Sequence, residues 1–424
     1  MQKLTKWLKL FVLFASTSNF VQAQDTALYL DSVISISLRN YPLVQQKQLV
    51  AKTAALTVEN LSKGYLPQIN LGAQATYQTA VTGLNISLPG MSIDPMSKDQ
   101  YKVQAEISQL IYDAGAIKAQ QQVQQLQAKV EDGKVEVELY KLKERVTQIF
   151  VAILYLDAQS AQLNLVEADL NIGLKKLTAQ VEQGVAYRSN LNTIKAELLK
   201  LQQRKIELAA NRTGLIDVLG LFMHQSLPAS QAFKKPATIE KEKIQIQRPE
   251  LTLFAQQSKL ALQQLQMIQA KNMPKAALFV QGGYGRPGLN MLKNSFEWFG
   301  IGGVKLSWSL GAWYTAPREK KIVQLQSDAI QIQQATFLLQ TATQQQQQLA
   351  EIKKLQQLIG TDREIIELRE SIRTAAEAQL QNGVITANDY LREVNAADQA
   401  RQTMLTHDIQ LMQAQLNLQL INGR

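Results

Sequence analysis

The sequence predicts a mostly α-helical protein with four amphipathic β-strands per chain, built as two tandem structural repeats. Three observations predict this fold class. Residues 115–183 carry an apolar residue at every seventh position, as a coiled-coil helix does. Two pairs of short segments alternate apolar and polar residues, as strands do: 68–78 with 101–112, and 276–286 with 296–310. Motifs of the first half also recur in the second half.

The stretch 115–183 predicts one uninterrupted helix, because no proline falls inside it. Such a helix would be roughly 100 Å long. Its apolar positions follow one another at intervals of mostly three or four residues, and a strict seven-residue repeat requires a left-handed coiled-coil partner. The predicted seam consists of Leu139, Leu142, Val146, Ile149, Ile153, Leu156, Leu163, Leu170, Leu174, Leu177 and Val181.

The start of the chain is typical of an exported protein. A basic start precedes a short apolar run at 10–15, and Ala23 ends a segment of small residues. These features predict a secretory signal peptide over 1–23. An amphipathic anchor helix is the alternative, but the run is shorter than the ~20 residues that cross a bilayer. No later segment is expected to be long and apolar enough for a transmembrane helix.

Composition argues against most enzymes and cofactor proteins. The chain has no cysteine and only two histidines, His224 and His407, which lie far apart. Disulfides, thiolate metal sites and cysteine nucleophiles are therefore excluded. The glycine-rich segments 282–285 and 300–303 lie in strand-like sequence and lack the lysine of a phosphate loop. We expect no catalytic, cofactor-binding or metal-binding residues.

The net charge of +10 does not indicate nucleic-acid binding. Lysines and arginines are scattered among glutamates along predicted helices, without a basic block or a basic-aromatic motif. A solvated helix surface explains this pattern better, so no nucleic-acid partner is expected.

The internal repeat defines the expected domains. Tyr41-Pro42 recurs as Arg248-Pro249, Leu66-Pro67 as Met273-Pro274, and Tyr77 as Tyr284, all at one offset. Farther along, the segment 179–185 matches 378–384, at a smaller sequence separation than the earlier motifs. The second copy has therefore lost residues between its two strands, and its loop there is expected to be shorter. We expect a first repeat over 24–220, a linker or equatorial segment over 221–247, and a second repeat over 248–424.

Each repeat is expected to contain a helix, two strands, a long helix and a return helix. In the first repeat the initial helix breaks at Tyr41-Pro42, and the return helix covers 188–220 after the long helix 115–183. In the second repeat the long helix covers 316–381 and the return helix 387–422. The predicted seam of this second long helix consists of Ile322, Leu325, Ala329, Ile332, Leu339, Ile352, Ile359, Ile366 and Ile372.

The four strands favour a membrane-embedded sheet over an ordinary half-buried hairpin. Their apolar faces match in parity across both repeats, and each strand has room for the ~10 residues that cross a bilayer when tilted. An open sheet edge is not tolerated in lipid, and four strands cannot enclose a lumen. Three chains would supply a 12-stranded barrel, which the helices would continue as a tube. The predicted aromatic girdle consists of Tyr77, Tyr101, Tyr284, Trp298 and Trp308.

The order and pairing of these features resemble the TolC family of outer-membrane efflux proteins. The resemblance rests on the signal peptide, the strand pair before each long helix, and four short motifs: Asn40-Tyr41-Pro42-Leu43, Arg248-Pro249-Glu250-Leu251, Gly184-Val185 and Gly383-Val384. It implies a homotrimer in the outer membrane of a Gram-negative bacterium, with an α-helical periplasmic tunnel. It also implies a passive exit duct of a tripartite efflux or type I secretion system. Its partners would be outer-membrane lipid, a periplasmic adaptor (membrane fusion protein) and an inner-membrane RND or ABC pump.

The resemblance also implies which residues form the periplasmic entrance. The helix turns at Gly184, Val185, Gly383 and Val384 would form the tips to which an adaptor docks. Asp389 matches an acidic residue that narrows and charges the opening in that family, and a second acid one turn later is replaced here by Arg392. Asn190 stands at the corresponding position after the first turn. An ion pair between Asp389 and Arg392 is a further expectation.

A second class of function stays open from the sequence. A non-channel coiled-coil scaffold or adaptor-like protein of the periplasm would also have a signal peptide and long helices. That interpretation leaves the four alternating strands and their aromatic flanks unexplained. The sequence names neither the cargo nor the pump, and it assigns no role to the loop 79–100, which is unusually apolar for a linker.

Overall fold

Two long helices dominate the computed structural model: α4 (Ala116–Glu182) and α7 (Ala312–Gln381). The structure describes residues 27–81, 96–236, 246–291 and 293–423. The predicted signal peptide, most of the loop 79–100 and part of the linker 221–247 lie outside the described residues.

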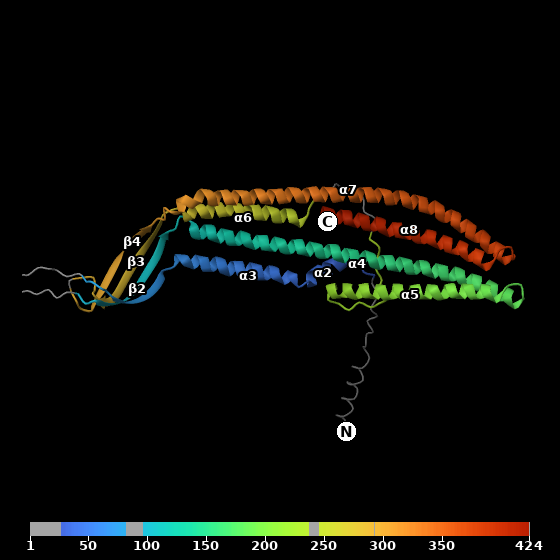
Figure 1. Cartoon of the computed structure of the whole chain (residues 1–424), viewed down its shortest axis with the longest axis horizontal. Coiled ribbons are helices and arrows are strands. Elements are labelled where there is room, and N and C mark those ends of the chain that lie inside the picture. The colour runs from blue at the N-terminus through green and yellow to red at the C-terminus, as the bar shows by residue number, and fades with distance from the viewer. Residues whose placement is uncertain (1–26, 82–95, 237–245, 292, 424) are drawn as a thin grey trace, which may run out of the picture. The chain divides into compact units, whose positions relative to one another are not determined.

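The remaining elements follow the order expected from the sequence (Figure 1). Before α4 come α2 (Leu30–Asn40), α3 (Leu43–Ser62), the short 3-10 helix η1 (Lys63–Tyr65), β1 (Gln68–Tyr77) and β2 (Asp99–Tyr112). Between α4 and α7 come α5 (Arg188–Met223), α6 (Pro249–Lys271), β3 (Lys275–Arg286) and β4 (Glu297–Ser307). The last helix is α8 (Ala387–Asn422).

Several boundaries differ from the expected ones for local reasons. The fourth strand ends at Ser307 instead of 310, and α7 already begins at Ala312, with Pro317 inside it. The helix α5 continues past 220 to Met223, where His224 takes the left-handed conformation (φ 54°) that ends it. The expected break between α2 and α3 falls at Tyr41-Pro42, since proline cannot donate a helix hydrogen bond.

The compact units of the structure do not coincide with the two sequence repeats. One unit comprises Met1–Tyr41, Leu142–Lys243 and Gln347–Leu420, and we call it the tip unit. The other comprises Pro42–Lys141, Ile244–Gln346 and Ile421–Arg424, and we call it the sheet unit. Each unit draws segments from both halves of the sequence, because α4 and α7 each run from one unit into the other. The two repeats are therefore a feature of the sequence. The compact units are divided differently, because their boundaries fall within the long helices α4 and α7.

The core of the tip unit confirms the predicted seam of α4. Leu142, Val146, Ile153, Leu163, Leu170 and Leu177 are all buried. The first three pack with apolar residues of α2, α5 and α8, including Val33, Ile216 and Met412. Leu170 and Leu177 belong to a second cluster with Ile194 of α5 and with Leu380, Tyr390 and Val394 of α7 and α8. Helix α4 thus supplies one continuous apolar stripe to both clusters.

The same helix corrects one expectation. An 18-residue window of α4 reaches a mean hydropathy of 1.4, with 33% of it buried, so by length and composition alone the helix could cross a membrane. The prediction that no later segment is apolar enough is therefore wrong. Core helices pass the same test, and Val146, Phe150 and Ile153 of α4 face the core of the tip unit.

The predicted seam of α7 is mostly exposed in the single chain. Ile359 is buried, but six other seam residues are exposed: Ile322, Leu325, Ala329, Ile332, Leu339 and Ile372. The residues that α7 buries within the chain, such as Val323 and Leu355, occupy other positions. Helix α7 therefore has an apolar stripe that the described residues of its own chain do not cover.

Candidate membrane face and channel entrance

The sheet unit contains one open, four-stranded antiparallel sheet in the order β1-β2-β3-β4. The strand register places Ile69 opposite Ile107, Ile107 opposite Val280, and Val280 opposite Gly302. Paired residues lie on the same face of a sheet, so the apolar positions of all four strands share one face. This confirms the parity inferred from the sequence.

That apolar face is exposed in the single chain. Leu71 of β1 is 83% exposed and Val280 of β3 is 62% exposed. The exposed members of this face are Ile69, Leu71, Val103, Ile107, Leu278, Val280, Val304 and Leu306. An apolar surface of this extent on an isolated chain marks contact with lipid or with another protein.

The opposite face is mainly polar. Gln281 donates a hydrogen bond to Gln104 Oε1 at 2.6 Å, across β2 and β3. The ammonium of Lys102 lies 4.6 Å from the ring centre of Phe299, which is buried on this face. Phe279, Phe299 and Ile301 make this face less polar in the second repeat than in the first. Its polar members are Gln68, Asn70, Gln74, Thr76, Gln100, Lys102, Gln104, Glu106, Ser108, Lys275, Gln281, Glu297, Lys305 and Ser307.

The aromatic residues predicted as a girdle fall into two groups at the two ends of the sheet. Where the strands meet their loops, Tyr284 lies opposite Trp298, with ring centres 5.1 Å apart. Phe296 stacks between Tyr101 and Tyr284 at 6.3 and 5.6 Å. Tyr77, also at this end, lies opposite Asp99.

Trp308 lies at the other end, where the sheet meets the helices. Its ring lies 5.5 Å from that of Trp313, and its indole nitrogen donates to the carbonyl of Asn272 at 3.1 Å. From Trp298 to Trp308 the chain advances about 33 Å at ~3.3 Å per residue. A strand tilted by about 45° then spans roughly 23 Å, close to the ~25 Å apolar band of outer-membrane barrels.

The two helix turns of the tip unit are built alike. Gly184 (φ 74°) and Gly383 (φ 70°) take the left-handed conformation that closes a helix. After each glycine, the amide of the valine donates back to the helix, Val185 to Gln180 and Val384 to Gln379, both at 2.9 Å. Both valines therefore end at the surface, 72% and 70% exposed.

The two turns lie beside each other. The side-chain amide of Gln180, in the last turn of α4, donates to the carbonyl of Leu380 in α7 at 3.2 Å. Beneath them Leu177, Ile194 and Tyr390 are buried in one cluster. The turns thus form a single exposed tip on a packed base.

Asp389 has a structural role that the sequence reasoning missed. Its carboxylate accepts hydrogen bonds from the Thr386 hydroxyl at 2.7 Å and from the Thr386 amide at 3.1 Å. The Asp389 amide in turn lies 3.3 Å from the Thr386 hydroxyl oxygen, which accepts its proton. This reciprocal arrangement is a capping box at the start of α8. The signal was present in the sequence as a threonine three positions before an acid.

The capping box also fixes the ionisation of Asp389. Hydrogen bonds from the Thr386 side chain and backbone, with a smaller contribution from the charge of Arg392, hold the pKa of Asp389 below its usual value. The expected Asp389–Arg392 contact does not form; the Arg392 guanidinium instead lies 3.2 Å from Glu393. At the start of α5 the structure shows no comparable capping box, because Tyr187, which precedes the helix, makes no capping hydrogen bond with its side chain.

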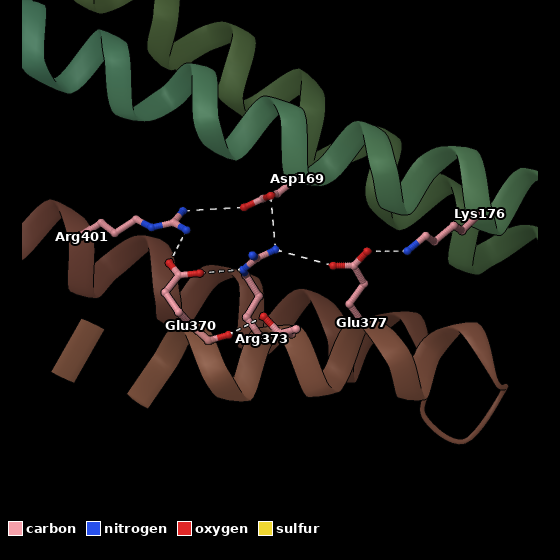
Figure 2. Close-up of polar contacts among 7 residues, drawn as sticks. Asp169, Lys176, Glu370, Arg373, Glu377 and Arg401 are labelled. Carbon is pink, nitrogen blue, oxygen red and sulfur yellow. Dashed lines mark hydrogen bonds and ion pairs between the residues drawn. The ribbon is translucent and has the colours of Figure 1, made fainter. Parts of the chain in front are cut away.

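A network of charges near the tip was not expected from the sequence. Figure 2 shows Arg373 of α7 between Asp169 of α4 and Glu370 of its own helix, at 3.3 and 3.0 Å. Arg401 of α8 pairs with the same two acids. Lys176 of α4 lies 2.5 Å from Glu377 of α7. Three helices are thereby joined by three acids and three bases.

Tyr390 lies beneath this network and is only 1% exposed. Burial, together with the charges of Glu377 and Asp169, raises the pKa of Tyr390 to about 12. A side chain on Gly173 of α4 would meet the Tyr390 ring at 3.0 Å, so the glycine lets the helices approach closely. The network was missed because a single sequence cannot show which of many scattered charges meet.

Among the described residues, no group of histidine, cysteine or carboxylate side chains could hold a metal ion. No protein-family model matches the chain, and no curated protein matches it in sequence.

Solved structures show the same fold. The Campylobacter jejuni CmeC outer membrane channel aligns at 14% identity over 93% of this chain and 85% of its own, with a TM-score of 0.66. CusC aligns at 14% identity over 93% and 92%, with a TM-score of 0.69. The open state of the Neisseria gonorrhoeae MtrE outer membrane channel aligns at 15% identity over 93% and 88%, with a TM-score of 0.65. The chain has the fold of these channels, which confirms the fold class predicted from the sequence.

Proposed function

We propose that three copies of this chain form a passive channel in the outer membrane of a Gram-negative bacterium. The channel would be the exit duct of a tripartite efflux or type I secretion system. A periplasmic adaptor and an inner-membrane RND or ABC pump would complete that system, and the pump would supply the energy. No catalytic step is assigned to the chain itself.

The exposed apolar face of the four-stranded sheet is the observation that carries this proposal. It is bounded by aromatic residues at both ends, and the face behind it is mainly polar. Among the described residues, no strand pairs with the outward edges of β1 and β4. In lipid those edges must pair, and pairing β4 of one copy with β1 of the next closes a barrel. The fold shared with known outer membrane channels supports this interpretation.

The helices of the sheet unit support a ring of identical copies. The exposed stripe of α7 runs through Leu325, Ile332 and Leu339 at seven-residue spacing, and Ile332 is 67% exposed. Helix α3 carries its own exposed pair, Leu49 and Leu56, also seven residues apart. Two different apolar stripes on one protomer suit a head-to-tail contact, which closes into a cyclic ring.

Electron microscopy of the detergent-purified protein tests the proposal. We expect three-fold particles for the wild type. Ile332→Asp places three buried charges in the ring and should convert most of the protein to monomers. Gln333→Asp adds the same charge at the neighbouring position and should leave the trimer intact. A monomeric wild type, or an Ile332→Asp variant that stays trimeric, would contradict the proposed ring and favour the periplasmic scaffold.

At the tip, we propose that Val185 and Val384 form the apolar contact for the adaptor, and that Asp389 charges the entrance. Both valines are exposed, although the residues Leu177 and Leu380 near the ends of the preceding helices are buried. The lowered pKa of Asp389 keeps its negative charge in place at neutral and mildly acidic pH.

Two substitutions separate the charge of Asp389 from its capping role. Asp389→Asn keeps an oxygen that accepts from Thr386 but removes the charge, so we expect single-channel cation selectivity to fall. Thr386→Ala removes the cap and keeps the charge, so selectivity should persist while the start of α8 exchanges its amides faster. Equal selectivity of Asp389→Asn and wild type would show that Asp389 is only a cap.

The pH dependence follows from the sign of the shift. Because the folded pKa of Asp389 is lowered, its contribution to the cap is present above the ordinary carboxyl pKa and is lost as the pH falls through the lowered value. Cation selectivity should therefore be constant from neutral pH down to about pH 4, near the ordinary carboxyl pKa.

A further inference from the structure

A pocket lies where the sheet meets the helices of the sheet unit. It has a volume of about 760 Å³. Its lining residues include Tyr112 of β2, Lys118 and Gln122 of α4, Gln266 of α6, Met273 in the segment after α6, and Lys320 of α7. Its size is within the ordinary range of small-molecule sites. None of the features discussed so far makes use of it.

One residue that lines the pocket, Tyr112, belongs to the apolar face of the sheet. Tyr112 lies opposite Ala276, and Ala276 lies opposite Leu306, which belongs to that exposed face. Tyr112 and Met273 are themselves exposed. In a membrane-embedded barrel the pocket would therefore face the lipid side at the level of Trp308, where headgroups begin.

The pocket lies beside the ends of β2 and β3 that meet the helices, so in a ring it would lie away from the contacts between copies. Helix α4 follows β2 and α6 precedes β3, and these two strands are the central pair of the sheet. The edge strands β1 and β4 and the exposed stripes of α3 and α7 would meet other protomers, whereas most of the pocket lining lies on α4 and α6, and among the lining residues only Lys320 lies on α7. A ring of three copies would thus leave the pocket open to lipid.

The charged groups of the pocket are both cationic. Within the described chain, neither Lys118 nor Lys320 lies within 4.0 Å of a carboxylate, and both are exposed. The nearby Asp113 already accepts hydrogen bonds from the amides of Gly115 and Ile117, at 2.9 and 2.8 Å. At the start of α7, Arg318, Lys320 and Lys321 outnumber the one acid, Glu319, so this segment carries a net positive charge.

We propose that this pocket binds the phosphate headgroup of an anionic phospholipid from the periplasmic leaflet. The two ammonium groups would bind the phosphate, the glutamine amides and the Tyr112 hydroxyl would bind headgroup hydroxyls, and the acyl chains would follow the apolar strands upward. Basic pockets beside membrane-embedded segments bind anionic lipids in this way. The proposal rests on the proposed function, since it needs the sheet to lie in a membrane.

Native mass spectrometry of the full-length mature protein in detergent tests the site. Dioleoyl-phosphatidylglycerol should bind the wild type more tightly than dioleoyl-phosphatidylcholine. The double variant Lys118→Gln/Lys320→Gln should weaken phosphatidylglycerol binding by about 25-fold, because each lysine contributes a factor of about five. The matched control Lys129→Gln/Lys353→Gln removes two exposed lysines elsewhere and should leave binding within about twofold.

Three results would overturn the proposal. In the first, the double variant binds phosphatidylglycerol as tightly as the wild type does. In the second, the wild type binds both lipids equally well. In the third, inorganic phosphate displaces phosphatidylglycerol at concentrations similar to that of the lipid, which would indicate a site for free phosphate. Conductance in planar bilayers, measured on the same samples, separates the two proposals. If the wild type conducts but shows no lipid preference, only the lipid site is wrong. If the wild type does not conduct, the channel proposal is wrong, and the mass spectra still show whether the protein binds phosphatidylglycerol at this pocket.

Discussion

Val280→Arg should prevent most of the protein from reaching the outer membrane as a folded trimer. Val280 lies midway along β3, opposite Ile107 on one neighbour and Gly302 on the other, and its side chain is exposed on the apolar face. An arginine at the midplane of a lipid-facing barrel surface costs about 2–4 kcal/mol. A three-fold ring would bear that cost three times.

Gln281→Arg is the matched control, because the neighbouring residue points to the opposite face and would line the lumen. This variant loses the hydrogen bond to Gln104 but should still assemble, with reduced cation conductance. Membrane fractionation and the heat-resistant trimer band measure both variants. If Val280→Arg assembled as well as Gln281→Arg, the apolar face would not contact lipid, and the channel proposal would fail.

This contrast between neighbouring residues is also why the sheet could be predicted from the sequence. A strand has a period of two, so alternation over ten residues assigns each side chain to a face without knowledge of any partner. The helix ends were predictable for a similar reason. Gly184 and Gly383 are local signals, because the left-handed conformation that closes a helix favours glycine wherever the chain goes next.

The exposed stripe of α7 could be recognised but not interpreted from the sequence. Its seven-residue spacing indicates a coiled-coil contact, yet periodicity does not tell whether the partner belongs to the same chain. The structure shows that Ile332 and Leu339 have no such partner among the described residues of their own chain. For α4 the same pattern did mark an internal core, because Val146 and Leu170 are covered by other helices of the tip unit.

The charge network of the tip unit lay beyond sequence reasoning altogether. Asp169 and Arg373 are 204 positions apart, and each resembles the many solvated charges around it. Only the packing of α4 against α7 and α8 brings them together. The aromatic residues of the sheet are an intermediate case. They could be singled out from the sequence as a candidate girdle, but their separation into two groups required the strand register that pairs Tyr284 with Trp298.

Arg373→Met should loosen the tip more than any other single substitution in the network. Arg373 contacts Asp169, Glu370 and Glu377, and its side chain is only 17% exposed. Its removal would leave three partly buried carboxylates with two remaining cations. Loss of one partner from a buried ion pair costs about 3–5 kcal/mol, and partial exposure places the expected cost here near 3 kcal/mol.

That cost should appear as local opening of α8, since Arg401 and the buried Tyr390 hold the helix to the same network. Trypsin provides the measurement, because Arg392 is an exposed cleavage site within α8 that is protected only while the helix is folded. About 3 kcal/mol corresponds to roughly 100-fold more of the open form and equally faster cleavage after Arg392.

Arg363→Met is the matched control for this experiment. It removes the same charge from the same helix, but Arg363 is exposed and forms no ion pair within the described chain. Its cleavage rate should stay within about twofold of the wild type, as for an isolated surface charge. Similar rates for the two variants would show that the network contributes no more than solvated surface charges, and that the apolar cluster around Leu177 and Tyr390 alone holds α8 in place.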